Sequence, residues 1–126
     1  EKEDDNIFGM VDAVVAGNRK QAFKLMADQR KIGEDDTYLF SMITRQFRIL
    51  VQLRDLFERK DNMTSEVLAR ELGLHTFVVK KSLPVVKKYP LSKLKNIYEQ
   101  LLQIDIKTKT GQGGQSILLD LFVGRS

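Results

Sequence analysis

The stretch Tyr38 to Arg59, YLFSMITRQFRILVQLRDLFER, decides the fold of this chain. Its apolar residues recur at steps of three and four, which return a side chain to the same face of a helix with about 3.6 residues per turn. They form two adjoining stripes and leave one narrow strip for water: Ser41, Arg45, Arg48, Gln52, Asp55 and Arg59. A helix that is apolar over so much of its circumference needs neighbours on several sides. We therefore predict that it is the central, buried helix of an all-α domain.

The other segments predict shorter helices around this one. Four positions carry side chains that cap helix N-termini by accepting hydrogen bonds from free N–H groups: Asn6, Asn18, Thr64 or Ser65, and Thr76. Pro84 predicts a kink or a break in the helix that it interrupts. Tyr89 and Pro90 start a further helix, and a last one is expected from Gln115 to Val123. The prediction is a compact bundle of about six to seven helices without strands.

The size and composition fit one domain. The chain has 126 residues, of which 42% are hydrophobic and 30% charged, as in ordinary globular proteins. We expect the acidic residues 1–5, which lack an initiator methionine, to be a linker remnant, and residues 6–126 to form a single domain of a longer protein. No apolar run approaches the roughly 18 residues of a membrane span. Membrane attachment is therefore not expected.

Positive charge is concentrated in residues 80–109. This segment contains eight lysines and only two acidic residues, Glu99 and Asp105, so its net charge is +6. Such a segment indicates nucleic acid or an acidic protein as partner, or simply a solvated face. Within 64–88, the sequence LARELGLHTFVVKKSL (68–83) has the spacing of a helix-turn-helix. In a DNA-binding reading, Lys80, Lys81, Lys87 and Lys88 would contact phosphates. The segment lacks the Arg, Asn and Gln side chains that read bases, and Pro84 would distort its second helix.

Nothing in the sequence resembles a catalytic or metal site. TGQGGQS (110–116) lacks the Lys-Ser/Thr ending of a phosphate-binding loop, and the single histidine, His75, has no nucleophile pattern around it. Asp35 and Asp36 are adjacent, so we interpret them as helix-capping charges and not as an acid/base pair. Without cysteine, one histidine cannot build an ordinary structural zinc site. No cofactor is expected.

Four charged residues are candidates for partner contacts. Arg45 and Arg48 lie on the one wet strip of the central helix, and arginine is favoured at interfaces. Asp105 projects beside an apolar stripe and precedes Lys109 by four residues, which is the favourable acid-first order for a helical ion pair. The alternatives are a solvated face for the arginines and a simple helix-end salt bridge for the pair.

With these stretches in view, the chain resembles the C-terminal domain of the bacterial DNA polymerase III delta subunit. The resemblance covers residues 6–124 and rests on four ordered stretches: IFGMVDAVVAGNRKQAFKLM, LFSMITRQFRILVQL, LARELGLHTFVVKKSL and LLQIDIKTKTGQGGQSILLDLF. Its clearest marks are RQFR (45–48), ELGLH (71–75) and Asp105 followed by Lys109. Thr76, Pro84 and Pro90 depart from the usual pattern of the family and put local helix geometry in question.

The resemblance implies a function without catalysis. In that family this region is the helical collar domain of the sliding-clamp loader, which associates with the delta-prime and tau/gamma subunits in a cytoplasmic replisome. The ATPase-like and clamp-opening parts lie upstream, so contact with the sliding clamp and activity in a polymerase holoenzyme would belong to the parent protein. The alternative is a helix-turn-helix module that binds nucleic acid through residues 64–88, and weak DNA contact is compatible with both readings.

Overall fold

The structure is a computed structural model that describes residues 2–59 and 63–125, with side chains from residue 6 onward. In these ranges the regular elements are seven helices and no strands, which confirms the predicted all-α class. They are α1 (Lys2–Ala16), α2 (Arg19–Lys31), α3 (Asp36–Arg59), α4 (Ser65–Leu72), α5 (Thr76–Lys88), α6 (Leu91–Lys109) and α7 (Gln115–Gly124).

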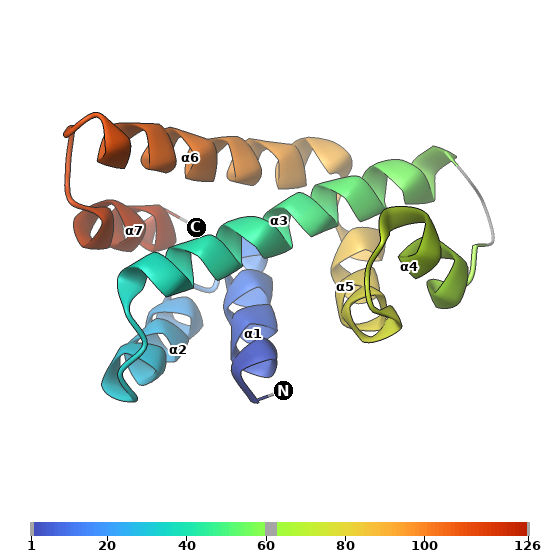
Figure 1. The fold of residues 1–126 in the computed structure, drawn as a ribbon, viewed down its shortest axis with the longest axis horizontal. Coiled ribbons are helices and arrows are strands. Elements are labelled where there is room, and N and C mark those ends of the chain that lie inside the picture. The colour runs from blue at the N-terminus through green and yellow to red at the C-terminus, as the bar shows by residue number, and fades with distance from the viewer. Residues whose placement is uncertain (1, 60–62, 126) are drawn as a thin grey trace.

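Helix α3 is the centre of the bundle, as its two apolar stripes predict. It packs against α1, α4, α5, α6 and α7, and α6 runs along one side of it while α1 and α5 lie on the other (Figure 1). Five of its side chains have essentially no exposed surface: Leu39, Ile43, Phe47, Leu50 and Leu53. The predicted wet strip is exposed except at Asp55, which is intermediate. Burial on several sides therefore gives α3 the stability that it could not have alone.

Several predicted helix ends are confirmed. The Asn18 side chain accepts a hydrogen bond from the Gln21 N–H at 3.2 Å, and Thr64 accepts one from the Val67 N–H at 3.2 Å. Gly73 ends α4 at φ 67°, in the left-handed region that glycine enters without steric cost. The stretch 68–83 is therefore a helix, a tight turn and a second helix, as its spacing predicts.

Other predicted ends are wrong. Helix α1 begins at Lys2, so Asn6 lies inside it; residues 2–5 are helical, and their origin as a linker remnant stays a prediction. An acidic run is compatible with a first helical turn, because negative charge there complements the helix dipole. The N-cap of α5 is His75, without a side-chain hydrogen bond, so Thr76 is helical and is not the cap.

Helix α5 also does not break at Pro84. Proline removes one backbone hydrogen bond and crowds the carbonyl four residues earlier. The helix nevertheless continues to Lys88, and its last turn contains the buried Val85 and Val86. Core packing therefore maintains the helix across the proline.

The C-terminal part of the chain is a helical hairpin on α3. After α6, a glycine turn reverses the chain and α7 runs back beside α6 (Figure 1). Gly111 and Gly113 have φ of 75° and 146°, so this turn needs residues without a side chain. The predicted helix-to-helix turn is confirmed. In the described part of the chain, none of the helices is long and apolar enough to span a bilayer.

Candidate subunit interface

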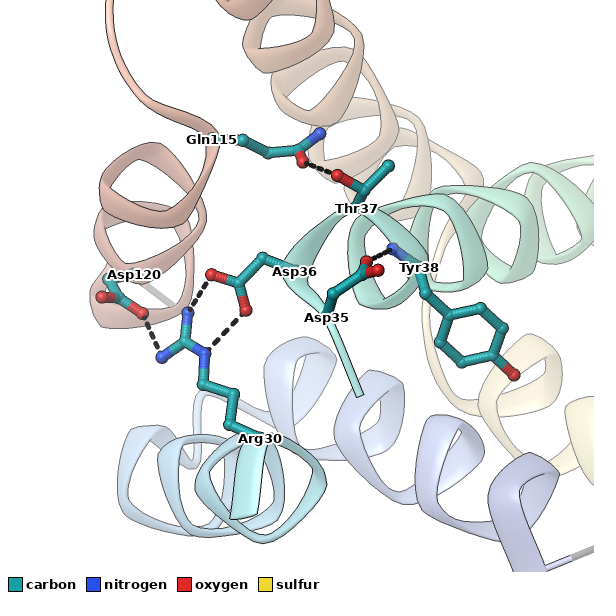
Figure 2. Close-up of polar contacts among 7 residues, drawn as sticks. All are labelled: Arg30, Asp35, Asp36, Thr37, Tyr38, Gln115 and Asp120. Carbon is teal, nitrogen blue, oxygen red and sulfur yellow. Dashed lines mark hydrogen bonds and ion pairs between the residues drawn. The ribbon is translucent and has the colours of Figure 1, made fainter. Parts of the chain in front are cut away.

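A polar cluster of Arg30, Asp36 and Asp120, which we call the Arg30 cluster, joins α2, α3 and α7 (Figure 2). Arg30 Nε and Nη2 donate to the two carboxylate oxygens of Asp36 at 2.8 and 3.1 Å. Its Nη1 lies 3.0 Å from Asp120 Oδ1, an ion pair. The forked guanidinium geometry suits such two-sided contact with carboxylates. One arginine therefore fixes α7 against the start of the central helix.

The charges of this cluster stabilise one another. The hydrogen bond from Arg30 holds the pKa of Asp36 below its ordinary value of 3.8, although partial burial opposes the shift. The hydrogen bond to Asp36 likewise raises the pKa of Arg30, with burial opposing it and Asp120 adding to it. Asp35 is a cap, as predicted, because it accepts from the Tyr38 N–H at 2.8 Å. Asp36 is instead an ion-pair partner.

Two further contacts tie α7 to the bundle. The Thr37 hydroxyl donates to Gln115 Oε1 at 2.9 Å, at the start of α7 (Figure 2). At the other end, Arg19 Nη1 donates to the Gly124 carbonyl at 3.2 Å. Such contacts with the last carbonyls of a helix satisfy groups that have no partner within it. Helix α7 is thus fixed by polar contacts at both ends as well as by its buried side chains.

The outer surfaces of α6 and α7 expose most of the large apolar side chains that lie outside the described core. Leu102 and Ile106 on α6 are 39% and 50% exposed, and Ile117 and Leu121 on α7 are 66% and 49% exposed. In each helix the two residues are four apart, so they lie on one face. We call these two exposed pairs together the apolar face. Exposed groups of apolar side chains are typical of interaction sites.

The predicted partner-contact residues do not form one cluster. Arg45 and Arg48 are exposed on α3, and Arg45 lines a hollow of about 130 Å³ with Phe8 and His75. The predicted ion pair between Lys109 Nζ and Asp105 Oδ2 is present at 3.0 Å. Among the described contacts, none joins either arginine to that pair. Asp105 and Lys109 instead lie three residues after Leu102 and Ile106, so they border the apolar face.

The four predicted phosphate-contacting lysines are all exposed but differ in their surroundings. Lys80 Nζ lies 3.8 Å from Glu66, and Lys81 Nζ lies 5.7 Å from the ring centroid of Phe77. Burial raises the pKa of Asp12, and the positive charge of Lys81 opposes that shift. Lys87 and Lys88 lie in the last turn of α5, away from these carboxylates. Lys80 and Lys81 are thus partly neutralised by acidic residues of the chain itself.

A basic corner forms where α5 meets α6. Lys88 Nζ and Lys93 Nζ lie 5.6 and 4.7 Å from the ring centroid of Tyr89. The stretch 73–98 contains Lys80, Lys81, Lys87, Lys88, Lys93 and Lys95 and no aspartate or glutamate. We call Lys87, Lys88, Tyr89 and Lys93 the basic corner. Lys88 and Lys93 have Tyr89 as an aromatic partner, and none of the three lysines has an acidic residue near it in the sequence.

The residues that connect helices carry little local signal in the sequence. Arg30 and Asp120 resemble ordinary surface charges there, and Gln46, which is buried, donates to the Ser82 hydroxyl at 2.7 Å. The one available signal for Gln46 is a polar residue between Arg45 and Phe47, at the edge of an apolar stripe. In the described part of the chain, no three His, Cys, Asp or Glu residues gather as metal ligands. The arrangement offers surfaces for binding.

Comparison with known proteins agrees with this architecture. The sequence pattern described as "DNA polymerase III delta subunit, C-terminal domain" matches residues 4–126. The chain is 28% identical over 120 residues to the DNA polymerase III subunit delta of Bacillus subtilis (strain 168), covering 95% of this chain and 34% of that protein. The solved structure of the Bacillus subtilis DNA clamp loader delta protein matches with a TM-score of 0.83 at 28% identity, over 94% of this chain and 34% of that one. The chain thus spans about a third of the length of both proteins. As its resemblance indicated, the chain belongs to the family of C-terminal domains of the DNA polymerase III delta subunit.

Proposed function

We propose that the chain is the collar domain of a clamp-loader delta subunit and assembles with the delta-prime and tau/gamma subunits without catalysing a reaction. The apolar face on α6 and α7 carries this proposal. Its four large side chains stay exposed although the bundle has a complete core of its own. Their burial by a partner would be favourable at about 25 cal/mol for each Å² removed from water. The family membership supports other clamp-loader subunits as the partners.

The charged candidates extend this proposal. Asp105 and Lys109 border the apolar face, where polar residues form the rim of a typical interface. Arg45 and Arg48 lie on α3 and would contact a different part of a neighbouring subunit. We expect these four residues to influence the rate and salt dependence of association more than its final strength, because rim charges act mainly by steering.

The test is a matched pair of substitutions. Ile117 on the apolar face is 66% exposed, and Ile32, which follows α2, is 67% exposed. We expect Ile117→Glu to weaken complex formation with delta-prime and tau/gamma by about tenfold or more, since central apolar contacts dominate interface energies. Ile32→Glu should leave it within about twofold. Size-exclusion chromatography and calorimetric titration measure both. Equal effects of the two changes, or no complex for the unchanged chain, contradict the proposal.

The second candidate function is DNA contact, which the basic corner favours. Two ammonium groups near one aromatic ring, with no ion pair to a carboxylate among the described residues, leave positive charge for an external anion. This favours Lys87 and Lys88 as phosphate contacts over Lys80 and Lys81, which have acidic neighbours. A DNA backbone is the polyanion that a clamp loader handles. This function can coexist with assembly through the apolar face, because the basic corner and the apolar face share no residue.

Fluorescence anisotropy with labelled primer–template DNA tests this candidate. Each phosphate contact contributes about −0.9 to the slope of log K against log salt concentration. We expect Lys87→Glu with Lys88→Glu to reduce the magnitude of that slope by about 1.8. Lys20→Glu with Lys31→Glu, on exposed positions of α2, changes the net charge equally and should have little effect. If both pairs weaken binding alike, only the net charge matters and the basic corner is not a site.

A further inference from the structure

A groove runs between α6 and α7 and continues onto the end of α1. It consists of two adjoining hollows of about 250 and 240 Å³, which share Gln100, Phe122 and Arg125 as lining residues. Helix α7 packs toward the core through Leu119, Phe122 and Val123, which are buried. Leu121, on the opposite side of the helix, lines the groove and is 49% exposed. The groove therefore joins the apolar face at Leu121.

The groove combines an apolar floor with a rim whose charges are positive. Its floor is apolar and includes Val14, Ile97 and Phe122 in the first hollow and Ile104 and Leu118 in the second. Its rim carries three cations, Lys93, Lys107 and Arg125, together with the amides Asn96, Gln100 and Gln103. Among the described residues, no carboxylate lines either hollow. A ligand that fits must therefore supply both apolar side chains and negative charge.

The cations are also available to a ligand. Neither Lys107 nor Arg125 has an ion-pair partner within the described residues, and both are exposed. Lys93 interacts with the Tyr89 ring, which leaves its charge uncompensated. Lys93 and Lys107 are separated along α6 by about 21 Å, at about 1.5 Å per residue. That length accommodates about six residues of extended chain, at about 3.3 Å each, or a helix of about four turns.

We propose that this groove binds an acidic segment of a partner subunit, with apolar side chains on the floor and Asp or Glu side chains at Lys93, Lys107 and Arg125. The inference rests on the proposed assembly function and specifies the chemistry of the partner. Nucleic acid fits the groove poorly, because phosphates over an apolar floor would lose water without gaining hydrogen bonds. Oppositely charged rims select partners and orient them, so the groove would determine which subunit occupies this side of the domain.

Site-specific photo-crosslinking identifies the occupant. The probe is p-benzoylphenylalanine in place of Gln103, which is exposed on the groove rim. The matched control carries it in place of Gln21, which is exposed on α2. After irradiation with purified delta-prime and tau/gamma subunits, mass spectrometry maps the crosslinks. We expect the groove probe, and not the control, to mark one partner segment that contains both apolar residues and Asp or Glu.

Charge reversal tests the recognition itself. We expect Lys107→Glu with Arg125→Glu to remove that crosslink and weaken the complex by about tenfold or more. Lys20→Glu with Lys31→Glu makes the same change in net charge. This control should leave the crosslink yield and the affinity of the complex within about twofold. Crosslinks to a segment without acidic residues, to DNA, or to the chain itself overturn the proposal. A complex that forms while the groove probe gives no crosslink also overturns the groove proposal, but it does not contradict the proposed assembly function. If no complex forms, both proposals fail.

Discussion

Asp36→Asn tests whether the Arg30 cluster holds α7 in place. The substitution keeps the shape of the side chain but removes the charge that faces the guanidinium, whose Nε and Nη2 lie 2.8 and 3.1 Å from the carboxylate. Hydrogen bonds to charged groups contribute about 1.5–3 kcal/mol each. The side chains of Arg30 and Asp36 are 32% and 21% exposed, and the asparagine oxygen still accepts one bond. We therefore expect a loss of about 1–2 kcal/mol, or about 3–10 °C in Tm.

The lowered pKa of Asp36 also predicts how the stability difference between the two proteins changes with pH. The pKa of Asp36 is lowered in the folded protein from its ordinary 3.8, so between the two values the unfolded chain binds more protons. The stabilisation from the charged carboxylate is therefore complete above about pH 4 and is lost as the pH falls through the folded pKa. Thermal unfolding followed by circular dichroism should show a lower Tm for Asp36→Asn at pH 7, and this deficit should shrink as the pH falls below the ordinary pKa of 3.8.

The matched control is Asp28→Asn. Asp28 pairs with Lys24 at 3.1 Å on the surface of α2, where the two side chains are 54% and 66% exposed. Exposed pairs of this kind contribute about 0.3–0.5 kcal/mol, so the change in Tm should be small. Two results would refute the reasoning: equal losses for the two variants, or a deficit of Asp36→Asn that stays constant across the pH range.

Two further pairs test the core and the turns, each by denaturant unfolding. Phe47→Ala should lower the free energy of unfolding by about 3–5 kcal/mol, because Phe47 is fully buried. The control Phe77→Ala, at a side chain that is 47% exposed, should lower it much less. Similar losses for the two variants would contradict the central position of α3. Gly73→Ala should destabilise by about 1 kcal/mol through its φ of 67° alone, because nothing lies within 4 Å of an added Cβ. Gly114→Ala, with equal space but φ −73°, should be neutral or slightly stabilising, so equal losses would refute a backbone origin.

Features that depend on residues close in the sequence, such as helices, caps and ion pairs within a helix, could be predicted from the sequence. The central helix follows from apolar spacing, since residues three and four apart must share a face. The caps at Asn18 and Thr64 and the Asp105–Lys109 pair are contacts between residues three or four apart. The same reasoning failed for Asn6 and Thr76, because several side chains near a helix start can cap it and the backbone selects one.

Contacts between helices could not be predicted in this way. Gln46 and Ser82 are 36 residues apart, and Thr37 and Gln115 are 78 apart. No periodicity links such residues, so their partners depend on how the helices pack. Arg30 illustrates the consequence, because in the sequence it resembles any solvated basic residue of α2. Its role appears only when α3 and α7 bring Asp36 and Asp120 to it.

The positions of these contacts link stability to the proposed docking. Helix α7 forms one wall of the groove, and it is held by the Arg30 cluster, by Thr37 and by Arg19. None of these contacts uses Lys107, Arg125 or Leu121, the groove residues proposed to meet a partner. The polar residues that position α7 are therefore separate from the residues that would bind. A substitution in the Arg30 cluster should consequently weaken assembly only as far as it shifts α7, whereas charge reversal at the groove rim should weaken assembly without changing Tm.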